Sequence, residues 1–539
     1  MTNGTSTADV VIADLEAAGI DTAFGIPGVH TLDLYRSIAR SGLRHVTPRH
    51  EQGAAFMADG FARASGRPAL CVLISGPGLM NAATAIGQAY SDSVPMVVLA
   101  SVNERRHLGL GRGELHEMRD QAQALGGIVS SNLRILDPVS ASRAVALSVG
   151  RIQAARPRPV YLELPLDVGA SPAAARSAPM ARLRPAGSDP QVLGEAARLL
   201  AEAERPLLIV GGGAAGASEQ IRRLVDLLKA PVLSSIAGKG IVPDDGPYSL
   251  GARLGTEAGR DLLRRSDVVL ALGTELAVPD HWADTLPIGG KLIRVDLDPD
   301  MLSDERFDTL PVLGDVGHAV NYFLRALAGR GKAAWAGDVA ALRRRSDESL
   351  LERRAPHLAM LAALRQALPD ESLVVTDMTQ IAYAGNQAFP ARRPRSWIHP
   401  VGFGTLGYAL PAAIGAKLAR PDIPVVALAG DYGFGFSGQE LGTAADLRLP
   451  LPVLVWNNAA LGQIAQDMDR QGIERIGVEI TPPRFDHLAA AYGAGFARVA
   501  EPAGLGDALA TALAADGPTV IEIVAEDGIR SSPDASARS

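Results

Sequence analysis

The stretch Val425-Val-Ala-Leu-Ala-Gly-Asp-Tyr432 ends an apolar run with an aspartate, and a second apolar run ends in Asn457-Asn458. Asn458 stands 27 positions after Asp431. Short apolar runs bounded by turn residues are typical of buried strands, and parallel strands present ligand-binding groups at their carboxyl ends. Mg²⁺ prefers about six oxygen ligands, including phosphate and water oxygens. A carboxylate and an amide at two strand ends therefore predict a site for magnesium and a diphosphate.

On both sides of this stretch, short apolar runs alternate with helix-like segments along the chain. This alternation favours parallel sheets covered by helices. A chain of 539 residues is too long for one ordinary core. We therefore expect an α/β protein of three doubly wound domains with mostly parallel sheets. The expected parts are an N-terminal domain over residues 1–170, a central Rossmann-like domain over 188–330, a C-terminal domain over 345–525 and a disordered tail over 526–539.

Individual elements follow from the same pattern. Helices are predicted over 9–18 and 340–354. Strands are predicted within 22–24, 70–74, 96–100, 160–164, 206–213, 231–234, 267–273, 291–298 and 519–524. In the central domain, Gly211-Gly-Gly213 follows a predicted strand. Such a turn either binds a nucleotide phosphate at a helix N-terminus or only joins a strand to a helix, and the sequence leaves both interpretations open.

The bulk composition limits the class of protein. The net charge of −7 argues against a nucleic-acid or anionic-membrane partner. Apolar runs have the length of strands rather than of transmembrane helices. The single cysteine, Cys71, excludes a disulfide framework and fits a reducing compartment. The first residues lack the basic and apolar parts of a secretory signal, so we expect a cytoplasmic protein.

Polar residues stand beside two apolar runs of the N-terminal domain. Glu51 opens a helix-like segment. A first-turn glutamate stabilises a helix through its dipole, whereas a carboxyl group removed from water has a raised pKa and exchanges protons near neutrality. Ser75-Gly-Pro-Gly78 and Asn81 follow another apolar run. They form either a plain turn and helix start or a place where backbone and an amide contact a polar ring.

Residues 45–105, 374–415 and 425–470, taken in order, resemble the acetolactate synthase and 2-oxoacid decarboxylase superfamily of thiamine-diphosphate enzymes. The resemblance implies that Glu51 binds the aminopyrimidine ring of the cofactor and drives deprotonation of the thiazolium carbon. It further implies cofactor contacts from the side chains Pro77, Asn81, Gln380 and Leu406.

The same resemblance implies that Mg²⁺ is bound by Asp431, Asn458 and the backbone carbonyl of Ala460. It implies a homodimer or homotetramer with the active site at the subunit interface, so that Glu51 and Asp431 come from different subunits. Tyr432 departs from the usual glycine of the family and could crowd the diphosphate turn. The flavin-contacting stretches of acetolactate synthases have no clear match in the central domain, so FAD is not expected.

The segment after Asn458 is predicted to form a helix with Ala460, Gln463, Ile464 and Asp467 on one face. If this face looks into the active site, Gln463 and Asp467 contact the substrate. A carboxylate there suits a guanidinium group, which it can bind in bidentate fashion. The alternative is a solvated aspartate on a helix surface.

His116, in Leu115-His-Glu117, resembles the histidine pair of pyruvate-type decarboxylases, with Glu117 in place of the second histidine. A histidine there could relay a proton, although a lone histidine is as often structural.

Several stretches are most similar to the branch of the superfamily that decarboxylates 5-guanidino-2-oxopentanoate (2-ketoarginine). We therefore expect non-oxidative decarboxylation of this 2-oxo acid to 4-guanidinobutanal and CO₂. The alternative is carboligation of 2-oxo acids, as in acetolactate synthase or glyoxylate carboligase. Glu51 argues against the glyoxylate carboligase branch, which lacks it. A purely binding or regulatory role is a third hypothesis, and Glu51, Asp431 and Asn458 argue against it.

Overall fold

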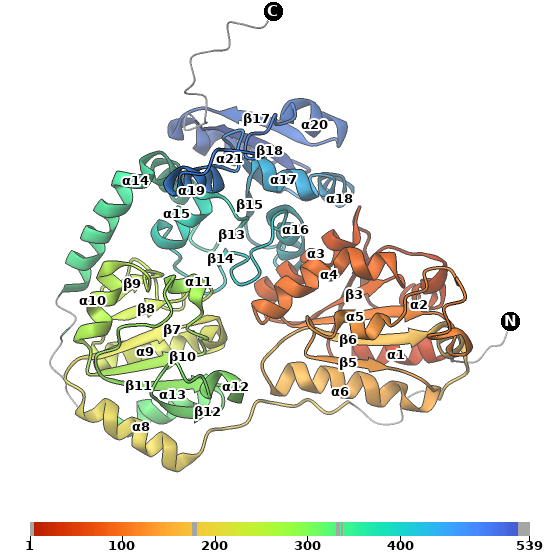
Figure 1. Cartoon of the computed structure of the whole chain (residues 1–539), viewed down its shortest axis with the longest axis horizontal. Coiled ribbons are helices and arrows are strands. Elements are labelled where there is room, and N and C mark those ends of the chain that lie inside the picture. Colours follow the sequence, from red (N-terminus) through yellow and green to blue (C-terminus); the bar gives the residue numbers. More distant parts are fainter. Residues whose placement is uncertain (1–4, 175–179, 330–334, 336–337, 526–539) are drawn as a thin grey trace, which may run out of the picture.

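The computed structural model of the chain describes residues 5–174, 180–329, 335 and 338–525. It consists of three α/β domains that lie around a common centre, with the N-terminal and C-terminal domains in direct contact (Figure 1). Each domain contains one six-stranded sheet, and the strands pair in parallel. The expected fold class is therefore confirmed. The predicted tail over 526–539 lies outside the described residues.

The N-terminal sheet has the strand order β2-β1-β3-β4-β6-β5. Its strands are β1 Thr22–Gly25, β2 Arg44–Val46, β3 Ala69–Leu73, β4 Met96–Val102, β5 Ser131–Arg134 and β6 Val160–Pro165. Its helices are α1 Thr7–Ala17, α2 Leu32–Ile38, α3 Glu51–Ser65, α4 Pro77–Ser91, α5 Gln121–Leu125, α6 Ala141–Ala154 and α7 Leu166–Ala170, with 3₁₀ turns at Val29–Thr31, Arg105–His107 and Pro138–Ser140.

The central sheet has the order β12-β11-β10-β7-β8-β9, which is the Rossmann order of two half-sheets that meet at β7 and β10. Its strands are β7 Pro206–Val210, β8 Val232–Ser234, β9 Ser249–Gly251, β10 Val268–Leu272, β11 Lys291–Asp296 and β12 Thr309–Leu313. Its helices are α8 Pro190–Glu202, α9 Ser218–Leu228, α10 Glu257–Arg265, α11 Val278–His281, α12 Pro299–Leu302 and α13 Val316–Ala326, with a 3₁₀ helix at Gly212–Ala217.

The C-terminal sheet has the order β14-β13-β15-β16-β18-β17, which repeats the order of the N-terminal sheet strand for strand. Its strands are β13 Leu373–Thr376, β14 Trp397–Ile398, β15 Val425–Gly430, β16 Pro452–Asn457, β17 Gly495–Val499 and β18 Thr519–Val524. Its helices are α14 Val339–Ala367, α15 Gln380–Ala388, α16 Ala409–Ala419, α17 Asp431–Ser437, α18 Glu440–Asp446, α19 Gly462–Gln471, α20 Phe485–Ala491 and α21 Leu505–Leu513, with a 3₁₀ turn at Pro502–Gly504.

Helices α3 and α16 hold the N-terminal and C-terminal domains together. A Cβ atom at Gly60 would lie 2.0 Å from the carbonyl oxygen of Ala412, and one at Gly415 would lie 1.9 Å from that of Met57. The two helix backbones therefore touch, and no side chain fits between them. Buried residues of both helices and of both neighbouring sheets form one shared apolar core.

Helix α14 belongs to two cores. Leu342 packs in the apolar core of the central domain, whereas Met360, Leu361 and Leu364 pack in the core of the C-terminal domain. Arg354 has non-helical angles (φ −140°, ψ 26°) and marks a kink between the two halves, two residues before Pro356. Proline removes one helical hydrogen bond and clashes with the preceding turn. The predicted helix over 340–354 therefore covers only the first half of the real one.

Among the described residues, no helix is both long and apolar enough to cross a bilayer.

Candidate active site

Three adjacent strands of the C-terminal sheet deliver the predicted diphosphate and metal residues. Gln380 is the first residue of α15, shortly after β13. Asp431 directly follows β15, and Asn458 directly follows β16. Because β13, β15 and β16 are neighbours in the sheet, these side chains meet at one edge. This edge is where ligands bind in open parallel sheets.

Hydrogen bonds fix the cluster. The Asp431 carboxylate accepts one bond from the backbone N–H of Tyr432 (2.7 Å) and one from that of Ala459 (2.6 Å). Asn458 donates from Nδ2 to Oε1 of Gln380 over 3.3 Å. All three side chains are buried. Burial raises the pKa of Asp431, and the backbone N–H groups oppose this effect.

The cluster fits a diphosphate and a hard cation. Gln380 Nε2 is buried, and among the described residues it has no hydrogen-bond partner. Such a donor requires an acceptor, and a phosphate oxygen would supply one. No three His, Cys, Asp or Glu side chains converge as a metal cluster in the described part of the chain. A magnesium ion at Asp431 and Asn458 would therefore take its remaining oxygens from backbone, diphosphate and water.

A residue other than glycine at position 432 causes no backbone strain. Tyr432 lies within helix α17, whose angles any residue adopts, and its ring contacts that of Phe436 with centroids 5.7 Å apart. Gly433 is the constrained position, because a Cβ there would lie 3.0 Å from Oδ2 of Asp377.

The prediction that Ala460 shares a helical face with Gln463 and Asp467 is wrong. Helix α19 begins only at Gly462. Ala459 adopts a left-handed φ of 54°, and Ala460 forms an isolated antiparallel bridge with Glu479. This long-range pairing takes Ala460 out of the helix and places it beside Asn458, whose Oδ1 accepts its backbone N–H over 3.2 Å.

The N-terminal domain assembles a second group around Glu51. Glu51 is the first residue of α3, and its Oε2 accepts a hydrogen bond from Asn81 Nδ2 of α4 (2.9 Å). Pro77 is the first residue of α4 and is exposed. Within one chain Glu51 is half-buried rather than buried. Glu440 of α18 anchors the segment just before it by accepting the backbone N–H of His50 (3.1 Å).

His116 has a histidine partner that sequence reasoning missed. Its ring lies edge-on to that of His30, with centroids 5.1 Å apart, and His30 Nδ1 lies 2.6 Å from Ser75 Oγ. His116 also has a left-handed φ of 60°, and its buried Nδ1 is unpartnered among the described residues. Burial and the neighbouring His116 lower the pKa of His30. The only sequence signal for His30 is its place in the loop after a predicted strand.

Glu117, next to His116, binds the backbone of its own loop. Its carboxylate accepts the backbone N–H groups of Gly111 (2.9 Å), Gly113 (2.7 Å) and Glu114 (3.0 Å). It therefore organises the loop that carries His116.

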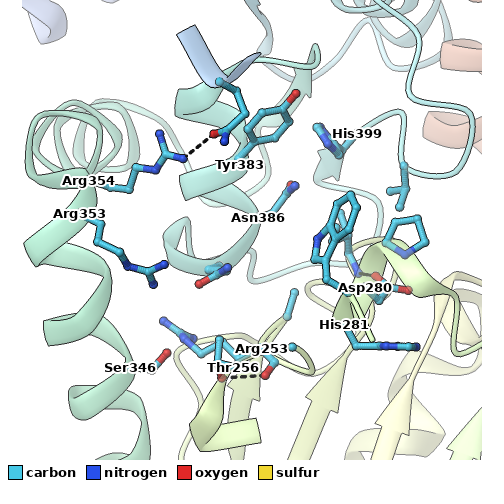
Figure 2. Close-up of a pocket in the computed structure, with 18 of the residues that line it drawn as sticks. Arg253, Thr256, Asp280, His281, Ser346, Arg353, Arg354, Tyr383, Asn386 and His399 are labelled. Atoms are coloured by element: carbon cyan, nitrogen blue, oxygen red, sulfur yellow. Dashed lines mark hydrogen bonds between the residues drawn. The ribbon is translucent and has the colours of Figure 1, made fainter. Parts of the chain in front are cut away.

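A cavity of about 1200 Å³ lies between the central and C-terminal domains. Gln463 and Asp467 line it together with Ile464 of the same helix. Figure 2 shows Arg353 and Arg354 of α14 pointing into this cavity. Tyr383, Asn386 and His399 line it from the C-terminal domain. The predicted face of α19 therefore lines a cavity, apart from Ala460.

Asp467 is held by a chain of hydrogen bonds. Arg354 donates to Oε1 of Gln463 (2.7 Å), and Gln463 donates from Nε2 to Oδ1 of Asp467 (3.2 Å). Arg470 forms an ion pair with the same carboxylate. Asp467 is therefore paired within its own chain, and its side chain is 38% exposed. A cationic substrate group would compete with Arg470, whose side chain is 69% exposed.

The two groups remain separate within one chain. Glu51, Asn81, Asp431 and Asn458 do not line the cavity. Among the described residues, no hydrogen bond joins the Glu51 group to the Asp431 group. Each chain thus carries two separate groups of residues on domains of identical strand order.

The first and third domains contain parallel sheets of one topology, and a Rossmann-like domain lies between them in the sequence. A cluster suited to a diphosphate lies at the edge of the third sheet. These features are those of a three-domain thiamine-diphosphate enzyme. Family models agree with this class. Residues 5–124 match the N-terminal, residues 193–323 the central and residues 377–523 the C-terminal domain of thiamine pyrophosphate enzymes. The chain belongs to this family.

The chain is also similar in sequence to individual enzymes of this family. The chain is 48% identical over 481 residues to the probable 2-ketoarginine decarboxylase of Pseudomonas aeruginosa, an alignment that covers 88% of this chain and 86% of that protein. It is 31% identical to the probable acetolactate synthase large subunit of Methanocaldococcus jannaschii, covering 96% and 91% of the two chains. It is 29% identical to the acetolactate synthase isozyme 1 large subunit of Escherichia coli, covering 90% and 88%.

Proposed function

We propose that this enzyme decarboxylates 5-guanidino-2-oxopentanoate (2-ketoarginine) to 4-guanidinobutanal and CO₂, as a step of arginine breakdown in the cytoplasm. The observation that carries the proposal is the 48% identity, over most of both chains, to a probable 2-ketoarginine decarboxylase. Asp467 on the cavity wall supports it, because a carboxylate there can bind the guanidinium end of the substrate.

The residues of the C-terminal domain would bind the cofactor and the metal ion. Thiamine diphosphate supplies, when bound, the carbon nucleophile and the electron sink that the loss of CO₂ requires. Gln380, Asp431, Asn458 and the Ala460 carbonyl would hold the diphosphate and a magnesium ion. Leu406, which lies in the loop before α16, would contact the bound cofactor with its aliphatic side chain.

Protons would move at the Glu51 group of the N-terminal domain. Glu51 would exchange a proton with the aminopyrimidine ring, and Asn81 keeps its carboxylate in place through their hydrogen bond. Pro77 would pack on the same ring. His116, with His30 beside it, would deliver the proton that replaces CO₂ on the carbonyl carbon and so completes the aldehyde. General acid–base groups of this kind contribute about 10²–10⁴-fold to a rate.

A second copy of the chain would complete each active site. Val29, Leu32 and Met80 are apolar side chains of the same domain as Glu51, and they are exposed in the single chain at 60%, 56% and 37%. Exposed apolar residues of this kind are typical of interaction surfaces. We therefore propose a homodimer, or a tetramer built from dimers, in which Glu51 of one chain faces Asp431 of another.

A product analysis tests the reaction directly. Purified protein with thiamine diphosphate and Mg²⁺ is incubated with 2-ketoarginine or pyruvate, and CO₂, aldehyde and condensation products are measured. We expect CO₂ and 4-guanidinobutanal from 2-ketoarginine. Condensation of pyruvate without CO₂ release from 2-ketoarginine would instead support the carboligase alternative. The similarity to acetolactate synthases is the reason for testing this alternative.

Asp467→Ala is expected to raise the KM for 2-ketoarginine about tenfold, because a charge-assisted bond to the guanidinium is worth about 1.5–3 kcal/mol. The KM for pyruvate, which has no cation to bind, should stay within about twofold. The matched control is Asp469→Ala, because Asp469 is on the same helix but pairs with Arg475 and does not line the cavity. Equal losses with both substrates would remove the specificity role of Asp467.

Asp431→Ala is expected to abolish cofactor binding. Thiamine diphosphate with Mg²⁺ at about 100 times Kd should stabilise the unchanged protein by about 2.7 kcal/mol, which a thermal shift assay detects as a higher Tm. The variant should show no such rise, because it loses the only carboxylate of the proposed metal site. Asp422→Ala, at an exposed aspartate, serves as the control. A full cofactor-induced shift in Asp431→Ala would disprove the metal assignment.

A further inference from the structure

Helix α4 takes part in the Glu51 group and also contacts the C-terminal domain. Its first residues carry Pro77 and Asn81, and Asn81 binds Glu51. Its last turn and its C-cap, Asp92, contact the loop over residues 401–405 of the C-terminal domain. The helix therefore runs from the Glu51 group to the loop that leads into Leu406.

Two side chains of α4 hold this loop through its backbone. Asp92 accepts the N–H of Val401 (3.0 Å) and the N–H of Gly402 (2.7 Å). Gln88 is fully buried, and its Oε1 accepts the N–H (3.2 Å) and the hydroxyl (3.0 Å) of Thr405. Gln88 and Asp92 are also bonded to each other, over 2.7 Å. We name this pair the α4 clamp.

The clamp is itself anchored. Arg63 of α3 donates to Asp92 over 2.8 Å and to Asp59 over 2.7 Å. Burial lowers the pKa of the nearby His399 imidazole to about 4, so that this ring adds no cation beside the clamp at neutral pH. Arg63 and Asp59 of α3 therefore lie beside Asp92, and Glu275 and Asp280 of the central domain also interact with Asp92 electrostatically.

The loop has little freedom against α4. A Cβ at Gly402 would lie 2.2 Å from Ser91 Oγ, so the loop backbone touches the helix. The next residue, Phe403, lies against Gly87, where a Cβ would come within 3.0 Å of its ring. Phe403 lines the cavity that contains Asp467. The position of the cavity wall thus depends on a helix of another domain.

We infer that Gln88 and Asp92 are positioning residues for the reaction. They act through the loop backbone on two side chains: Phe403 in the cavity wall, and Leu406, which directly follows the clamped Thr405. Asp377 fixes the far end of the loop by accepting the N–H of Gly407 over 3.0 Å. The inference rests on the proposed function of Leu406 beside the cofactor, and on the contacts of Phe403 independently of it.

Gln88→Met and Asp92→Asn test the clamp. We expect kcat for CO₂ release to fall about tenfold to a hundredfold at saturating cofactor, because small displacements of groups near a reaction centre have effects of this size. Hydrogen–deuterium exchange of a peptide covering residues 399–408 should become faster in the protein without cofactor. This second readout does not depend on turnover.

Asp244→Asn is the matched control. Asp244 is also buried, pairs with the buried Lys239 (2.6 Å) and accepts the N–H of Ala391 in another domain (3.1 Å). The Asp244→Asn variant should lower Tm about as much as Asp92→Asn. It should leave kcat and the hydrogen–deuterium exchange of residues 399–408 unchanged. A similar loss of kcat in Asp244→Asn would show that Asp92 acts only on stability.

Gly87→Ala keeps the proposal testable if the clamp variants fold poorly. Alanine is tolerated in a helix, so Tm should be maintained, while its Cβ displaces Phe403 and changes KM for the 2-oxo acid severalfold. Unchanged KM, together with unchanged exchange in Gln88→Met, would overturn the inference. If the wild type releases no CO₂ from 2-ketoarginine, the proposed substrate is wrong, whereas the clamp is still judged by loop exchange and by kinetics with the 2-oxo acid that is turned over.

Discussion

Glu51→Gln is expected to release CO₂ from 2-ketoarginine at least about a hundredfold more slowly than the unchanged enzyme. Glutamine keeps the size of the side chain and can still bind Asn81, but it cannot exchange a proton with the aminopyrimidine ring. The loss should be the same for any 2-oxo acid, since activation of the cofactor precedes every reaction. Steady-state CO₂ release with two substrates measures it, and the thermal shift with cofactor should remain.

The competing explanation for Glu51 is a first-turn glutamate that only stabilises helix α3. Glu219→Gln is a suitable control, because Glu219 occupies the first turn of α9. It should cost less than about 1 kcal/mol of stability and leave activity intact. If Glu51→Gln behaves like Glu219→Gln and keeps more than a tenth of the rate, the proton-exchange role is rejected.

Gly415→Ala is expected to lower the free energy of unfolding by about 3 kcal/mol or more. A Cβ at this position would lie 1.9 Å from the Met57 carbonyl oxygen, so α3 and α16 would have to move apart inside the shared core. Overpacking of cores typically costs about 1–3 kcal/mol, and a clash with rigid backbone belongs at the upper end. Urea denaturation followed by circular dichroism measures the change.

Gly506→Ala provides the comparison for this variant. Gly506 is helical, in the first turn of α21, and a Cβ there would meet no atom within 4 Å. The same exchange should therefore be neutral or slightly stabilising, because alanine has the higher helix propensity. A small effect of Gly415→Ala, comparable with that of Gly506→Ala, would contradict the tight contact between α3 and α16.

The fold was predictable because its strands are buried. β10, β15 and β18 appear in the sequence as short apolar runs, since each has helices or neighbouring strands on all sides. The strand ends then follow, and with them Asp431 and Asn458. The order of strands within each sheet is set by long-range pairing and was not predicted.

Contacts between distant segments account for what sequence reasoning missed or got wrong in the site. Helical spacing puts Ala460 on the face of α19, and its bridge to Glu479, which overrides that spacing, leaves no local signal in the sequence. Arg354 and Gln463 are 109 positions apart, and His30 meets His116 across two loops. The roles of Glu51 and His116 in catalysis stay predictions.

The kink of α14 connects the angle between two domains to the shape of the cavity between them. One half of this helix is packed into the central domain and the other into the C-terminal domain, and the bend falls at Arg354. Arg354 is in turn bonded to Gln463 of α19. A rotation of the central domain would have to change this bend, and it would act on α19 through the Arg354–Gln463 hydrogen bond. The angle between the two domains and the shape of the cavity between them are therefore geometrically coupled.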